Sequence, residues 1–286
     1  MNPASAADAG APGDSRDDQQ RLRRLLRVLL FTAILLILVR IFVLEPYGIP
    51  TGSMRPTILE GDVILVSKLP YTIRSIQYIP FTRIAIPYLE LPGLGTLERG
   101  DVVVFEYPPF AGGLEPGEES QFVKRTAAVK GDTIQLLNGR IRVNGDEVPG
   151  VLDEGDDEPQ RRSPIRTGRA AMILQGEERL IVPYAGYELL LDSARAENWR
   201  PVIESEGVRV EYRNRIVFLD GLPALSYTFR RDYFFALGDN SGASRDSRFF
   251  GFIPYENLIG QAWLIYWSRD PDTGDIRWER LGSFVR

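Results

Sequence analysis

The chain of 286 residues is 44% hydrophobic and has a formal net charge of −5, which permits a substantial core and argues against a nucleic-acid-binding surface, because phosphates require clustered Lys and Arg. It contains no Cys and no His, so thiol nucleophiles, disulfides, thiolate metal sites and a Ser-His-Asp triad are excluded. A general base near neutral pH must therefore be a Lys, Asp, Glu, Tyr or terminal amine with a shifted pKa.

The N-terminal part of the chain predicts a tail followed by a membrane anchor. Residues 1–20 are rich in Ala, Gly, Ser and Asp without apolar periodicity, which is typical of a disordered tail. Four arginines between residues 21 and 27 then precede an apolar run from Val28 to Leu44, in which only Arg40 is charged. This run is at the short end of the ~17–25 residues that cross a bilayer.

Two other interpretations of this run fit less well. A buried core helix would be apolar on one face, whereas this run is apolar all round. A cleaved signal peptide would need a small-x-small site after the run, and the chain continues Phe42-Val-Leu-Glu-Pro46 instead. We therefore expect a single-pass anchor over residues 21–45 in the cytoplasmic (inner) membrane. The positive-inside rule places the N-terminus in the cytoplasm and the remaining chain on the periplasmic or extracellular side.

Short β-branched segments bounded by Gly and Pro follow the anchor and predict a mainly β fold. Asn138-Gly139 lies between two such segments and suits a tight hairpin turn. Long amphipathic helices are hard to find. The predicted strands cover residues 62–67, 101–106, 133–137, 140–143, 179–182, 208–212, 216–219, 233–237 and 262–267.

Residues 150–230 carry no motif with recognisable chemistry, and we interpret them as an inserted, smaller β-rich lobe. The acidic run at residues 153–158 predicts a solvated loop, because its spacing does not match a calcium-binding loop. Residues 46–149 and 231–286 then form the β domain that contains the chemistry.

Three segments carry residues suited to catalysis. Ser53 lies in the Pro/Gly-rich segment IPTGSMRPTI, Lys124 lies in QFVKR, and residues 236–251 read ALGDNSGASRDSRFFG. Each segment alone is ordinary: a turn serine, a solvated strand lysine, and a polar loop with a surface ion pair. A buried Lys124, however, would have a lowered pKa and could accept a proton from a serine hydroxyl.

Together and in this order, the three segments resemble the conserved boxes of the type I signal peptidase family: S-M-x-P-T, K-R followed by G-D, and G-D-N followed by S-x-D-S-R and G. The resemblance implies a signal-peptidase-like β fold, whose core is shared with self-cleaving repressors, preceded by one N-terminal transmembrane helix. It implies a membrane-bound serine endopeptidase that cleaves N-terminal signal peptides from exported preproteins after small residues, through an acyl-enzyme. No metal or organic cofactor is implied.

The resemblance also implies roles for individual residues. Ser53 corresponds to the acylating nucleophile and Lys124 to the general base. Thr51 corresponds to a hydroxyl that stabilises the oxyanion together with the Ser53 backbone N–H. Ser244 corresponds to the serine that orients the lysine amine.

Further residues correspond to the support and the substrate pockets of the family's site. Asp246 and Arg248 correspond to a structural ion pair. Lys130 replaces the usual proline of a P-G-D turn, and residues 241–243 depart from the usual Arg-Asp-Asn, so the resemblance says less about the loop shape near Ser244. The residues that correspond to the shallow pockets for small side chains are Tyr47, Ile49, Met54, Ile58, Phe122 and Val123.

The partners implied are preprotein signal peptides, the lipid bilayer and, by proximity, the protein export channel, with no nucleic acid. Two alternatives stay open. A self-cleaving Ser/Lys protein of the repressor type is disfavoured by the anchor and by the lack of a helix-turn-helix. An inactive membrane-tethered scaffold that binds exported peptides is disfavoured because Ser53 and Lys124 are both intact.

Overall fold

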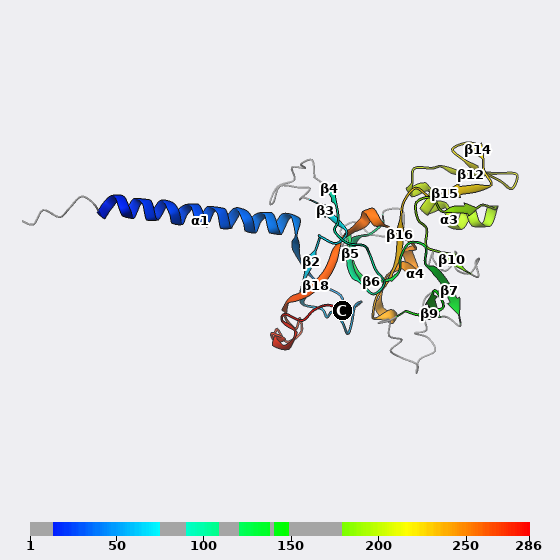
Figure 1. The fold of residues 1–286 in the computed structure, drawn as a ribbon. Helices are drawn as coiled ribbons and strands as arrows, with labels where there is room; N and C mark the ends of the chain where they lie inside the picture. The colour runs from blue at the N-terminus through cyan, green and yellow to red at the C-terminus, as the bar shows by residue number, and fades with distance from the viewer. Residues whose placement is uncertain (1–13, 75–89, 109–119, 138–139, 149–178) are drawn as a thin grey trace, which may run out of the picture.

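The computed structural model describes residues 14–74, 90–108, 120–137, 140–148 and 179–286. A long helix, α1 (Asp14–Phe42), extends away from a body made mostly of β-sheets (Figure 1). The helix begins before residue 21, so residues 14–20 are helical where we expected tail; acidic residues favour the first turn of a helix. The large apolar side chains from Leu22 to Leu38 are exposed. No helix among the described residues is both long and apolar enough to cross a membrane.

A seven-stranded antiparallel sheet forms the centre of the body. Its strand order is β1-β2-β18-β5-β6-β16-β17, so strands from the start and the end of the chain lie side by side (Figure 1). The strands are β1 (Leu44–Gly48), β2 (Asp62–Ser67), β18 (Leu258–Ser268), β5 (Val102–Glu106), β6 (Gln121–Ala128), β16 (Tyr233–Leu237) and β17 (Ile253–Pro254).

The predicted strands at 62–67, 101–106, 233–237 and 262–267 all belong to this sheet, with small differences in their bounds. In β2 every second side chain is buried, as expected for a strand with one face on the core. β5 and β16 are buried on nearly all positions and read as continuous apolar runs. β6 pairs with β5 in a register that sets Lys124 opposite Val103, which brings a charged residue into the middle of the sheet.

A second sheet has the order β10-β7-β8-β9. The predicted pairing of residues 133–137 with 140–143 is confirmed, while the turn at 138–139 lies outside the described residues. The other Asn-Gly pair, Asn144-Gly145, joins β8 to β9 with φ of 54° and 92°, the left-handed conformation that a tight hairpin turn requires. The strands are β10 (Leu180–Ile181), β7 (Thr133–Leu137), β8 (Arg140–Val143) and β9 (Asp146–Glu147).

The described part of the predicted lobe, residues 179–230, mixes short strands with a helix that we did not predict. Asp192 caps the N-terminus of α3 (Ser193–Ser205) by accepting from the N–H groups of Ala194 and Arg195, and Trp199 is buried against the core. The acidic run at 153–158 lies outside the described residues. The remaining elements are β11 (Glu188–Leu190), β12 (Val210–Arg213), β13 (Ile216–Leu219), β14 (Leu222–Pro223), β15 (Ser226–Thr228), β3 (Thr72–Arg74), β4 (Glu90–Pro92) and the short α4 (Ser247–Phe250).

Candidate active site

The structure brings Ser53 and Lys124 into direct contact. Ser53 lies in the loop between β1 and β2, and Lys124 lies on β6. Lys124 Nζ is 2.8 Å from Ser53 Oγ, a hydrogen-bond distance, although the two residues are 71 positions apart in the sequence. The exposed fractions are only 3% for Lys124 and 8% for Ser53, so little water competes for this contact.

The surroundings of Lys124 increase the share of its neutral form. The pKa of its ammonium group falls from 10.5 to about 8, mainly because of burial and also because of the charge of Arg248, while Asp246 and Asp239 oppose the shift. The amine also donates to Val123 O at 2.8 Å and lies 5.5 Å from the centre of the Phe122 ring. A lysine in this state can accept a proton near neutral pH.

The loop after β16 holds the backbone of the nucleophile loop. Asn240 N–H donates to Ser53 O, and Asn240 Nδ2 donates to Gly52 O, both at 3.1 Å. Gly238 N–H donates to Asp246 Oδ2 at 3.0 Å, which fixes the start of the same loop. These contacts set the position of Ser53 through the main chain rather than through its side chain.

Gly238 also permits a close approach that a larger residue would prevent. A Cβ at this position would lie 2.1 Å from Ser244 Oγ and 2.6 Å from Ser53 O. Ser244 is therefore a close neighbour of the nucleophile loop. Its hydroxyl oxygen is buried and has no hydrogen-bond partner among the described residues, so its role in orienting Lys124 stays a prediction.

Two buried ion pairs flank the dyad. Arg248 makes a bidentate contact with Asp246, with Nε and Nη2 each 2.8 Å from a carboxylate oxygen, and its Nη2 donates to Ser241 O at 2.7 Å. Arg125 makes the same bidentate contact with Asp239: its Nε donates to Oδ1 at 2.7 Å and its Nη2 donates to Oδ2 at 2.6 Å. Sequence analysis proposed the first pair and missed the second.

The dyad opens on a cleft of about 1030 Å³. The exposed Thr51 lies on its wall, together with five of the six predicted pocket residues. Ile58 does not line the cleft: it is fully buried in the core with Ile49 and Met54, which corrects our assignment. The predicted residues on the wall are Tyr47, Ile49, Met54, Phe122 and Val123, and the unpredicted ones include Glu45, Val104, Ala243 and Arg245.

The residues that sequence analysis missed share one property: each acts on a partner far away in the chain. Arg125 and Asp239 are 114 positions apart, and Asn240 and Gly52 are 188 positions apart. Their only signal in the sequence was their place inside the motifs that carry the family resemblance. Within the described ranges, no three acidic side chains converge as ligands for a metal ion.

Comparison with known proteins gives the family of the chain. The sequence model of the family described as "Signal peptidase, peptidase S26" matches residues 22–267. A signal peptidase I of Buchnera aphidicola subsp. Schizaphis graminum is 28% identical over 264 residues, which cover 88% of this chain and 78% of the relative. A signal peptidase I of Rickettsia typhi is 30% identical over 247 residues, covering 83% and 77%. The chain therefore belongs to the signal peptidase family, peptidase S26.

Proposed function

We propose that Ser53 and Lys124 form the catalytic dyad of this chain. Membership of the family assigns to the chain the cleavage of signal peptides by a serine endopeptidase, and the dyad would carry out that cleavage. The observation that carries the proposal is the 2.8 Å contact between Lys124 Nζ and Ser53 Oγ in a buried setting. A serine nucleophile beside a base of lowered pKa is the arrangement that acyl transfer requires. In a chain without His, the lysine takes the part of the base.

The reaction proceeds through an acyl-enzyme. The neutral Lys124 amine takes the proton of Ser53, whose Oγ attacks the carbonyl carbon of the scissile bond. The Ser53 backbone N–H and the Thr51 hydroxyl stabilise the oxyanion. The Lys124 ammonium then protonates the departing amine of the mature chain. A water molecule deprotonated by Lys124 finally cleaves the ester, which releases the signal peptide and restores Ser53.

We propose that the cleft selects substrates with small side chains before the scissile bond. Ile49 and Met54 are almost fully buried where they meet the cleft, so they offer a shallow floor rather than a deep pocket. Phe122 and Val123, on β6, line the same cleft. A shallow apolar floor accepts Ala or Gly and collides with larger side chains, and one methylene group in an apolar pocket is worth about 1–3 kcal/mol of discrimination.

We propose that α1 anchors the protein in the cytoplasmic membrane, as a single pass with a cytoplasmic N-terminus. Support comes from the exposed apolar side chains on all faces of the helix and from the arginines ahead of them. The catalytic β domain, residues 46–149 and 231–286 with the lobe at 150–230 inserted, would then face the periplasm or exterior. Anchoring near the lipid surface and the export channel raises the local concentration of emerging signal peptides.

The test is cleavage of a preprotein with a small-x-small site by the full chain in lipid-supplemented detergent. The wild-type chain should cut after the small residue, while Ser53→Ala and Lys124→Met should be inactive with unchanged melting temperatures. Lys130→Met is the matched control, because Lys130 is a half-exposed lysine near the end of β6 that pairs with Asp232. Cleavage by the Ser53→Ala chain, or wild-type activity of the Lys124→Met chain, would refute the dyad.

A further inference from the structure

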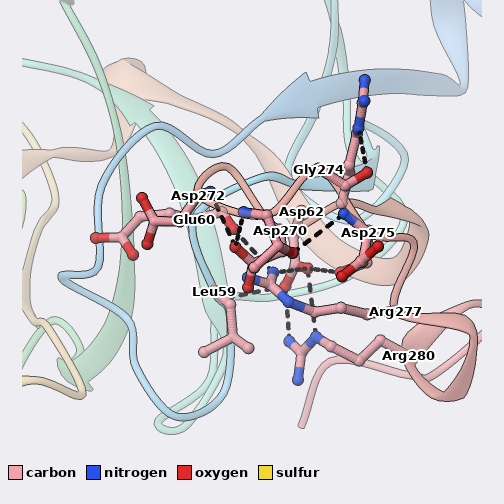
Figure 2. A network of polar contacts seen from close by, with 12 residues as sticks. Leu59, Glu60, Asp62, Asp270, Asp272, Gly274, Asp275, Arg277 and Arg280 are labelled. Carbon is pink, nitrogen blue, oxygen red and sulfur yellow. Dashed lines mark hydrogen bonds and ion pairs between the residues drawn. The ribbon is translucent and has the colours of Figure 1, made fainter.

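The last residues of the chain fold back over the base of the nucleophile loop. After β18 the chain turns at residues 270–275 and returns along the same strand: Ile265 N–H donates to Ser283 O, and Gly282 N–H donates to Ile265 O, both at 2.9 Å. We call residues 269–286 the C-terminal strap. Figure 2 shows two of its arginines, Arg277 and Arg280, directed at residues 59–62. The strap therefore contacts the segment that follows Ser53.

The target of the strap is Asp62, a fully buried carboxylate at the first position of β2. Arg280 donates from Nη2 to Asp62 Oδ2 at 2.6 Å and from Nε to Oδ1 at 3.3 Å. Ser268 Oγ donates to Oδ1 at 2.6 Å, and Leu59 N–H donates to Oδ2 at 2.8 Å. The Asp62 carboxylate thus binds a loop amide, the last residue of β18 and the strap at the same time.

The same two arginines also bind main-chain oxygens of the loop itself. Arg280 Nη2 donates to Thr57 O at 3.0 Å, and Arg277 Nη1 donates to Glu60 O at 2.9 Å while its Nη2 binds Asp270 at 2.8 Å. Contacts from a planar guanidinium to fixed carbonyl oxygens constrain position more strongly than a charge alone. The strap therefore restrains the backbone of residues 57–60.

This restraint reaches the nucleophile through short connections. The loop is closed at its base, where Ile49 N–H donates to Asp62 O at 2.8 Å, and Ile58 N–H donates to Met54 O at 2.9 Å just after Ser53. Thr57 Oγ1 donates to Asp239 at 2.6 Å, the carboxylate that Arg125 holds next to Lys124. A shift of residues 57–60 would consequently move Ser53 relative to Lys124.

We propose that Arg277 and Arg280 of the C-terminal strap are positioning residues, which act on catalysis by fixing the loop that carries Ser53. The inference rests on the proposed dyad, since it concerns the distance between its members. Neither arginine lines the cleft. Loss of either should therefore lower kcat while leaving KM for the preprotein nearly unchanged, because a displaced nucleophile affects the chemical step more than ground-state binding.

The experiment compares Arg277→Met, Arg280→Met and the double variant Arg280→Met/Asp62→Asn in the full chain. The double variant removes the guanidinium without leaving a buried unpaired carboxylate, and Asn keeps an acceptor for Leu59 N–H. Arg269→Met is the matched control, because the Arg269 side chain donates to Gly274 O inside the strap. We expect kcat to fall about 10- to 100-fold in the three test variants, with KM within about twofold and control activity unchanged.

The readouts separate this inference from the dyad. The Ser53→Ala chain, tested in parallel, must be inactive; if it cleaves, the dyad fails whatever the strap variants do. With an inactive Ser53 variant, an unchanged kcat in the strap variants overturns the positioning role alone. A raised KM with an unchanged kcat in the strap variants also overturns the positioning role. A double variant that melts below the assay temperature also overturns it, because the strap would then stabilise the fold as a whole.

Discussion

The backbone of Gly238 leaves no room for a side chain between Ser244 and the nucleophile loop. A methyl group there would lie 2.1 Å from Ser244 Oγ and 2.6 Å from Ser53 O, whereas an ordinary contact is at least 3.4 Å. The shortfall is about 1.3 Å at the hydroxyl and about 0.8 Å at the carbonyl. Rotation of the Ser244 hydroxyl would leave Ser244 Cβ only 2.5 Å from the added methyl group, and Ser53 O belongs to the main chain. In Gly238→Ala the backbone around Ser53 and Ser244 must therefore shift.

The consequence for activity should exceed the consequence for stability. Overpacking of this kind costs about 1–3 kcal/mol of folding free energy, whereas a displacement near 1 Å at a reacting group lowers the rate by about 100-fold. Gly238→Ala should thus retain cooperative thermal unfolding with a modest fall in melting temperature. Its kcat for preprotein cleavage should fall by about two orders of magnitude, as measured by gel-based initial rates.

Two further variants identify the cause. Gly242→Ala is the matched control in the same loop, because no atom lies within 4 Å of its added Cβ. Gly238→Ala/Ser244→Gly removes the collision with Ser244 and keeps the one with Ser53 O, so it should remain as slow as Gly238→Ala. Wild-type kcat in Gly238→Ala would refute the reasoning, and recovery in the double variant would assign the defect to Ser244 instead.

Three other predictions concern charge and packing. Because burial lowers the pKa of Lys124 to about 8 and only the neutral amine can accept the Ser53 proton, kcat/KM should fall roughly tenfold per pH unit below that pKa; a flat profile there would contradict a lysine base. Arg125→Gln leaves the buried Asp239 carboxylate unpaired and should lower the free energy of unfolding by about 3–5 kcal/mol in denaturant titrations. The same substitution at the exposed Arg213 of β12 should lower it by less than about 1 kcal/mol. Trp199→Ala should cost about 3–5 kcal/mol in the same titration, and a loss below 1 kcal/mol would show that α3 is not packed as described.

The strands were predictable from sequence because their signal is local. The segment at 62–67 alternates between core and surface, and Asn144-Gly145 adopts the turn that its composition favours. The prediction at 262–267 covered only part of β18, which begins at Leu258. Gly260 interrupts the β-branched pattern on which the prediction relied. A Cβ at this position would lie 2.4 Å from Ser67 O, so the glycine permits a close approach of two strands.

The helix α3 and the contacts of the site were not predictable in the same way. Pro201 and several charged residues interrupt the apolar spacing of α3, yet Ala196 and Trp199 are buried, so tertiary packing outweighs a weak local preference. The partners of Ser53 and Asp239 are set by strand pairing across the whole chain, which periodicity does not encode. Their proximity could be expected only from the family resemblance.

The environment of Lys124 explains why arginines accompany both carboxylates near the dyad. Asp246 and Asp239 each raise the pKa of Lys124, while burial lowers it. An unpaired carboxylate beside the amine would favour the ammonium form, in which the lysine cannot act as a base. Arg248 and Arg125 each bind one carboxylate through two hydrogen bonds, and the charge of Arg248 itself lowers the pKa of Lys124. We infer that Arg248 supports catalysis electrostatically, by helping to keep Lys124 able to accept a proton, while both arginines hold the loops in place through their contacts with Ser241 O and Gly100 O.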